Sequence, residues 1–296
     1  STVKGIKQSE LRKIILPIPP EHEQIKIAGH LRALDDKIQL NHQINQTLEQ
    51  MAQAIFKSWF VDFDPVKAKI AALEAGGSEE ETLLAAMQAI SGKGEAQLTR
   101  LQAEQPEQYA ELRATAELFP SAMQDSELGE IPEGWRHSTI GEEVTVCGGS
   151  TPSTKEPEFW EGGHHCWATP KDLSSLRFPV LLDTDRKITN AGLSKISSGL
   201  LPVGTVLLSS RAPIGYMAIA EVPTAINQGF IAMKCDGVLP NVFVLAWCRE
   251  SMDAIVGNAN GSTFQEISKS NFRPLRVVVP SDPVLTSFTR SADSLY

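Results

Sequence analysis

The sequence predicts an α+β protein in which a long helix is joined to a domain of mixed helices and strands. Three observations predict this class. Residues 21–60 contain no proline and place apolar residues at helical spacing. Residues 119–282 contain short apolar runs separated by Gly, Pro, Ser and Asn, which is typical of mixed helices and strands. The chain also repeats its first residues near its end.

Residues 1–20 are expected to form a terminal segment that ends in a strand. Residues 13–18 are a short apolar run like those of buried strands, and two prolines stop it at 19–20. A long helix is expected over residues 21–64. Pro20 suits the first position of a helix, and Glu21 and Glu23 suit the positive N-terminal end of the helix dipole.

This helix carries an apolar stripe whose members are alternately four and three residues apart. The pattern predicts a coiled coil, and about 40 residues at 1.5 Å each form a rod of roughly 60 Å. Two asparagines on the stripe would select register and orientation. The alternative is a long helix that lies across its own domain. The predicted seam consists of Ile27, Leu31, Leu34, Ile38, Asn41, Asn45, Leu48, Ala52, Ile55 and Trp59.

The remaining chain divides into three segments. Residues 65–118 are acidic and rich in Ala, Glu, Gln and Leu, which predicts an insertion of short surface helices. Residues 119–282 are expected to form the mixed domain, and residues 283–296 the start of a second, truncated helical region. Within the mixed domain we expect a helix over 241–256 and strands over 203–210, 214–220, 230–235 and 275–279.

An internal repeat relates the two ends of the chain at an offset of 261 residues. Its first copy is therefore expected to be the tail of a domain like the one that ends near Pro280. Further positions match in apolar character. The identical pairs are Ser1 and Ser262, Thr2 and Thr263, Ile6 and Ile267, Ser9 and Ser270, Arg12 and Arg273, and Pro19 and Pro280.

Charge and composition exclude several classes of protein. The net charge is −9, and residues 70–118 alone carry three basic against nine acidic side chains. A uniformly basic protein that coats nucleic acid is excluded. No segment approaches the roughly 20 apolar residues of a membrane helix, and no secretory signal begins the chain, so we expect a cytoplasmic protein. The four cysteines lack paired spacing, which predicts reduced thiols.

Motifs of catalysis are absent from the sequence. There is no phosphate-binding GxxxxGK[ST] loop, no GxGxxG after a strand, no HExxH and no Asn/Asp-Pro-Pro-aromatic run. His164, His165 and Cys166 do not predict a metal site, because neighbouring side chains on a strand point apart and no second ligand pair follows. No catalytic residue and no metal are predicted.

Five motifs in order carry a family resemblance. They are IPPEHEQ at 18–24, LDDKI at 34–38, MAQAIFKSWFVDFDP at 51–65, LGEIPEGW at 128–135 and GGSTPS at 148–153. Together they resemble the specificity subunit of type I restriction-modification enzymes over essentially the whole chain. The resemblance implies two target-recognition domains held apart by long helices, of which residues 119–282 would be one.

The resemblance also implies a function and partners. The subunit would read double-stranded DNA at a bipartite target and dock methylation and restriction subunits without catalysing a reaction. S-adenosylmethionine, ATP and Mg would belong to those partners, and this chain would hold no cofactor. The sequence departs from the family pattern after Pro280, where the opening of a second long helix is degenerate. We therefore expect two copies to pair their helices as a homodimer that reads a palindromic bipartite site.

The aromatic residues near the end of the long helix are too many for one seam. Phe56, Phe60 and Phe63 are predicted to dock the methylation subunit, and the alternative is that they pack in the core of the mixed domain.

Polar loops of the mixed domain hold the residues predicted to contact DNA, because base edges are read by side chains with defined donors and acceptors. For Arg211 the alternative is stabilisation of its own turn, for Asn227 and Gln228 it is binding to backbone groups, and Trp167 is expected in the core. The predicted contacts are Ser150, Thr151, Lys155, Thr169, Lys171, Ser209, Arg211, Asn227, Gln228, Ser262, Thr263 and Lys269. A coiled-coil adaptor that joins proteins without reading DNA remains the rival function.

Overall fold

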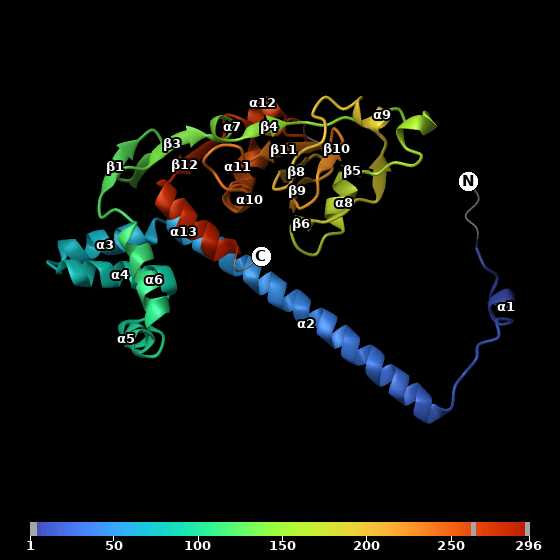
Figure 1. Ribbon diagram of the computed structural model, residues 1–296, viewed down its shortest axis with the longest axis horizontal. Helices are drawn as coiled ribbons and strands as arrows, with labels where there is room; N and C mark the ends of the chain where they lie inside the picture. The colour runs from blue at the N-terminus through green and yellow to red at the C-terminus, as the bar shows by residue number, and fades with distance from the viewer. Residues whose placement is uncertain (1–4, 262–264, 294–296) are drawn as a thin grey trace. The chain divides into compact units, whose positions relative to one another are not determined.

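The computed structural model describes residues 5–261 and 265–293, and the chain divides into two units, residues 1–46 and 47–296 (Figure 1). The first unit holds the short helix α1 (Gln8–Leu11) and the first part of α2 (Glu21–Phe60). The predicted long helix is confirmed. Gln24 Nε2 donates a hydrogen bond of 2.7 Å to the carbonyl of Pro19, which closes the first turn over the two prolines.

The predicted strand over residues 13–18 is wrong. The equivalent residues 261 positions later form β12 (Arg276–Val279), which pairs antiparallel with β3 (Arg136–Thr139). No described strand pairs with the first copy, whose Leu16 and Ile18 are 70% and 74% exposed, whereas Val277 and Val279 are 2% and 3% exposed. An apolar run becomes a strand only where another strand takes up its backbone hydrogen bonds.

The C-terminal part of α2 lies in the main core of the second unit. Ala52, Phe56, Trp59 and Phe60 are buried there. The Trp59 ring meets the Phe119 ring edge-on, with centroids 5.1 Å apart, and Ile55 packs against the same core. The prediction that Ile55 and Trp59 continue a coiled-coil seam is therefore wrong, because these side chains are covered by their own chain.

Four short helices follow α2, of which the first packs its Val66 in the main core and the last three enclose a small core of their own. Leu83, Met87 and Leu98 are its largest buried side chains. Ser78 and Glu81 form a reciprocal capping box, and Arg113 holds Glu80 through two bonds of 2.5 and 2.8 Å. The four helices are α3 (Asp64–Glu74), α4 (Glu79–Ser91), α5 (Glu95–Glu104) and α6 (Pro106–Glu117).

Two sheets form the centre of the mixed domain, and a hairpin and the β3–β12 pair flank them. The five-stranded sheet has the order β4 (Thr145–Cys147), β11 (Phe230–Lys234), β8 (Val206–Ser210), β9 (Ile214–Ala220) and β6 (Val180–Leu181). The three-stranded sheet has the order β10 (Thr224–Ile226), β5 (His165–Ala168) and β7 (Arg186–Ile188). The hairpin is β1 (Met123–Ser126) and β2 (Gly129–Pro132). The four strands predicted in this domain are confirmed as β8, β9, β11 and β12, with small differences at their ends.

Short helices connect the strands. The predicted helix over 241–256 is two helices, because Ser251 departs from helical geometry with a ψ of 11°. No helix in the described part of the chain is long and apolar enough to cross a membrane. The helical elements are α7 (Ile140–Glu143), η1 (Pro157–Phe159), α8 (Pro170–Ser174), α9 (Asn190–Leu193), α10 (Asn241–Glu250), α11 (Met252–Gly257), α12 (Lys269–Phe272) and α13 (Asp282–Asp293).

Helix α13 packs beside the last turns of α2 (Figure 1). Its Phe288 ring lies 5.1 Å from the Phe60 ring and 5.9 Å from the Phe56 ring, and Val284 and Leu285 are buried with it. At the offset of the repeat, α13 is the counterpart of the first turns of α2. The segment after Pro280, which the sequence indicates to be degenerate, therefore still forms a helix, and its Phe288 covers the end of α2.

Candidate nucleic-acid interface

Loops from both sheets meet at one edge of the mixed domain. Strand β11 is antiparallel to β4 and to β8, so β11 begins where β4 and β8 end. Strands β5 and β10 are parallel and end together, and β7, antiparallel to β5, begins beside them. Residues 227–229 join β10 to β11, which brings the two edges together. We call the residues at this edge (148–156, 169, 186, 211–213, 227–229 and 266–269) the loop edge.

The loop after β4 supplies Ser150 and Thr151. The Thr151 hydroxyl lies 2.6 Å from Gln228 Oε1, and the Ser150 hydroxyl donates to the carbonyl of Lys195 at 3.3 Å. A Cβ on Gly149 would lie 1.9 Å from the carbonyl oxygen of Ile226, so only glycine permits this approach. The structure thus brings together Ser150, Thr151 and Gln228, which are predicted DNA contacts from segments far apart in the sequence.

Thr169 and Lys171 lie at the start of α8. Thr169 caps the helix reciprocally with Asp172, and its hydroxyl donates to Asp172 Oδ2 at 2.7 Å. The exposed Lys171 lies 3.6 Å from Asp185. Lys171 is therefore available to solvent, whereas the hydroxyl of Thr169 already holds the helix start.

The prediction that Ser209 contacts DNA is wrong. Ser209 is fully buried, and its hydroxyl donates to the carbonyl of Pro213 at 2.8 Å and accepts from the backbone N–H of Tyr216 at 2.9 Å. It ties together the turn between β8 and β9. Its neighbour Arg211 is partly exposed on that turn and lies 3.6 Å from Glu266. The ion pair joins Arg211 to a distant segment and not to its own turn, so neither the DNA contact nor the turn-stabilising alternative is decided for Arg211.

Asn227 binds the backbone, as its alternative predicts. Its Oδ1 accepts the N–H of Gly229 at 2.8 Å, while the adjacent Gln228 is exposed. Trp167 is buried in a core, as expected.

Two of the predicted cations lie free at the loop edge. Lys269 begins α12, and its Nζ lies 3.1 Å from the place of a Cβ on Gly148. Lys155 is exposed, and neither lysine makes an ion pair within the described residues. Ser262 and Thr263 lie outside the described residues.

Three residues of this surface are missed by the sequence analysis. The guanidinium carbon of Arg186 lies 3.6 Å from the centroid of the Trp160 ring. Lys195 is exposed beside the loop that begins at Ser150. No motif surrounds Arg186, Trp160 or Lys195, and Arg186 reaches the loop edge through the pairing of β5 with β7. Sequence spacing alone therefore does not reveal them.

Among residues 5–261 and 265–293, no group of three or more His, Cys, Asp or Glu side chains could hold a metal ion. His165 Nε2 instead lies 2.7 Å from Asn190 Oδ1. All four cysteines are unpaired, and burial raises the pKa of the Cys235 thiol to about 12 and also raises the pKa of Cys248.

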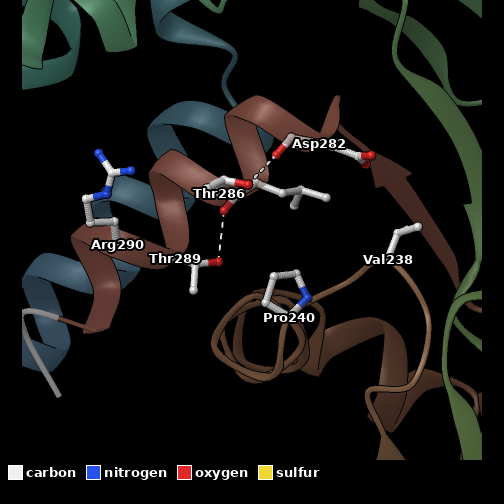
Figure 2. A pocket seen from close by; sticks show the side chains of 7 residues that line it. Val238, Pro240, Asp282, Thr286, Thr289 and Arg290 are labelled. Atoms are coloured by element: carbon white, nitrogen blue, oxygen red, sulfur yellow. Dashed lines mark hydrogen bonds between the residues drawn. The ribbon is translucent and has the colours of Figure 1, made fainter.

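A cavity of about 580 Å³ lies apart from the loop edge, between α13 and the segment before α10 (Figure 2). Its hydroxyls are already engaged, since Thr286 and Thr289 donate to carbonyls of α13 at 2.9 and 2.8 Å. Asp282 and Arg290 are its only ionisable lining residues within the described part of the chain. This cavity therefore offers no candidate chemistry.

The prediction that Phe56, Phe60 and Phe63 dock another protein is wrong, and the core alternative holds. All three are buried, and the Phe60 ring meets the rings of Trp135 and Phe243 at 5.9 and 5.0 Å. No face of these rings is left for a partner.

Comparisons with known proteins identify the family. The family model described as "Type I restriction modification DNA specificity domain" matches residues 1–50 and 132–284 and leaves the whole helical insertion over residues 65–118 unmatched. The HindI type I restriction enzyme specificity subunit of Haemophilus influenzae is 34% identical over 100% of this chain and 65% of its own length. The MjaIX specificity subunit of Methanocaldococcus jannaschii is 38% identical over 55% of this chain and 38% of its own length.

A solved structure, the type I restriction-modification system S subunit from M. genitalium, is 14% identical with a TM-score of 0.49, and covers 100% of this chain and 60% of that one. The chain thus spans about two thirds or less of the relatives it matches. Because the family model covers more than half of its residues, the chain belongs to the family of type I restriction modification DNA specificity domains.

Proposed function

We propose that this protein is the DNA-recognition part of a type I restriction-modification system. It would read one part of a bipartite target in double-stranded DNA and direct partner methylation and restriction subunits to that target. The observation that carries the proposal is the loop edge, where polar and cationic side chains of six segments converge in a member of this family. Such an edge offers both base-reading groups and phosphate-binding cations.

The chemistry would belong to the partners. In this proposal the chain holds no cofactor, and S-adenosylmethionine, ATP and Mg act on the methylation and restriction subunits in the cytoplasm. The absence of catalytic motifs from the sequence supports this division. The net charge of −9 also supports this division of roles. Contacts with phosphates dominate DNA affinity, so an acidic chain would depend on a partner subunit for many of them.

We further propose that two copies pair through α2. Ile27, Leu31, Leu34 and Ile38 form one stripe and are each 50–58% exposed within the described residues. An unpartnered apolar stripe on a helix is stabilised by a second helix, and Asn41 and Asn45 would set the register. The seam is shorter than the sequence predicts, because its last part packs on α13 and the mixed domain.

The protein would then recognise DNA as a symmetric pair. Two identical mixed domains related by a two-fold axis read two identical half-sites, so the target would be palindromic and divided by a spacer.

The experiment that tests this function is a selection from randomised duplex DNA. The full chain is mixed with its methylation subunit, bound DNA is captured, and the recovered sequences are read. A two-part palindromic motif is the expected result. A single half-motif would keep the recognition function and contradict the paired copies. DNA recovered without any shared motif would contradict the recognition function and favour the adaptor.

A further inference from the structure

Arg186 begins β7 at the loop edge and is held there by two aromatic rings. Its guanidinium carbon lies 3.6 Å from the centroid of the Trp160 ring and 5.2 Å from that of Trp167, which is its neighbour across the β5–β7 pair. Stacking on indole orients the plane of a guanidinium and restricts its side chain. Arg186 therefore presents a defined face although it is exposed.

The same rings anchor the loop after β4. Trp160 Nε1 donates to the carbonyl of Ser153 at 2.9 Å, and Trp167 Nε1 donates to the carbonyl of Ser150 at 3.3 Å. The two rings meet edge-on with centroids 4.9 Å apart. Arg186 and the loop of Ser150 and Thr151 are thus positioned by one aromatic pair.

Arg186 has no acidic partner within the described residues, unlike three of the cations nearby. Lys171 lies beside Asp185, Arg211 beside Glu266, and Lys187 pairs with Asp183. For Arg186, the described residues provide neither an ion pair nor a side-chain hydrogen bond. Since one face lies on Trp160, the N–H groups at the edge of the guanidinium remain available to an external acceptor.

We propose that Arg186 reads a guanine of the target, donating two hydrogen bonds to O6 and N7 in the major groove, and that Trp160 is its positioning residue. The proposal rests on the proposed DNA-recognition function. A fixed guanidinium plane matches the paired acceptors O6 and N7 of guanine. The same plane can bind two oxygens of a phosphate, but Arg186 stands among the polar side chains of the loop edge, which suit base edges.

The test compares Arg186→Gln and Arg186→Lys with the wild-type chain, each in complex with the methylation subunit and selected on randomised duplex DNA. We expect Arg186→Gln to lose the preference for guanine at one position of each half-site, and Arg186→Lys to weaken it, because an ammonium can donate to guanine but lacks the planar fork. Affinity for the wild-type motif should fall roughly 5- to 150-fold, the range expected for one lost bidentate contact. Affinity for DNA with that guanine replaced should be unchanged relative to the wild-type chain.

Two matched comparisons isolate the role of geometry. Arg100→Gln removes the same charge from α5 and should leave both motif and affinity unchanged. Trp160→Leu should relax the same guanine position as the Arg186 variants, and Trp160→Phe, which retains an aromatic face, should restore much of the preference. Thermal unfolding of each variant checks that the domain remains folded.

Three results would overturn the proposal. A motif that is unchanged in Arg186→Gln would show that Arg186 reads no base. An equal loss of affinity for all DNA sequences would assign Arg186 to a phosphate. If the wild-type chain itself selects no motif, the proposed DNA-recognition function is contradicted. This outcome differs from a failure of the Arg186 proposal alone, in which the wild-type chain still selects a motif.

Discussion

Individual aromatic residues show how packing decides the role of a side chain. Phe60 lies on a helix whose first part bears an exposed apolar stripe, yet its neighbours are Phe243 of α10 and Phe288 of α13. These partners are more than 180 residues away in the sequence. Helical spacing identifies the face on which a residue lies, but the long-range neighbour decides whether that face is buried.

Replacing Phe60 with alanine should destabilise the whole second unit. Truncation of a buried phenylalanine leaves a cavity, and such changes cost about 3–5 kcal/mol of unfolding free energy. Urea unfolding followed by circular dichroism measures the loss. Phe178→Ala removes a phenylalanine that is 39% exposed and should cost less than half as much. Equal stabilities of the two variants would contradict the core assignment of Phe60.

Arg136 and Glu143 should make stability dependent on pH. Two hydrogen bonds of 2.5 and 2.8 Å from Arg136 hold the pKa of the buried Glu143 carboxyl below its ordinary value of 4.5. The unfolded chain therefore binds this proton more readily. The stabilisation is present above pH 4.5 and is lost as the pH falls through the lowered pKa of the folded state.

Glu143→Gln tests this dependence. The variant should be less stable than the wild-type chain by about 1–2 kcal/mol at pH 7, the worth of a charge-assisted hydrogen bond. The difference should shrink as the pH is lowered from 5 to 3. Urea unfolding at several pH values measures it, and a difference that is constant across this range would exclude titration of Glu143 as the cause.

At the scale of elements, the two copies of the internal repeat agree in one element and differ in the next. Helices α1 and α12 occupy equivalent positions, so the local helical signal is expressed in both copies. The following apolar run forms a strand only as β12, where β3 pairs with it. A short helix closes its hydrogen bonds within itself, whereas a strand depends on a second segment.

The exposed part of the α2 seam leads to a prediction about association. Leu34→Glu places a charge on the seam and should dissociate the paired copies, because burial of an unpaired carboxylate at a helix interface is costly. Ala33→Glu adds the same charge beside the seam and should leave the pair intact. Sedimentation equilibrium measures the mass of each variant. A Leu34→Glu chain that remains dimeric would show that the copies pair through another surface.

At the scale of the whole molecule, the acidic residues and the polar and cationic residues lie in different segments. The acidic insertion carries its own small core and lies outside the family match. The cationic and polar residues instead gather where the strands of two sheets begin and end. A protein of net charge −9 can therefore still present a local surface suited to DNA, because attraction to phosphates depends on nearby charges within about 10 Å at moderate salt.

The sequence by itself determined the long helix, the strands β8, β9 and β11, and the family motifs, because each depends on neighbouring residues in the chain. Only the tertiary structure decided that Ser209 is buried, that the end of α2 lies in the core, and that Arg186 stands beside Trp160. These three outcomes depend on contacts between segments distant in the sequence. Periodicity describes the faces of one element, and the pairing of elements determines which of those faces reaches water.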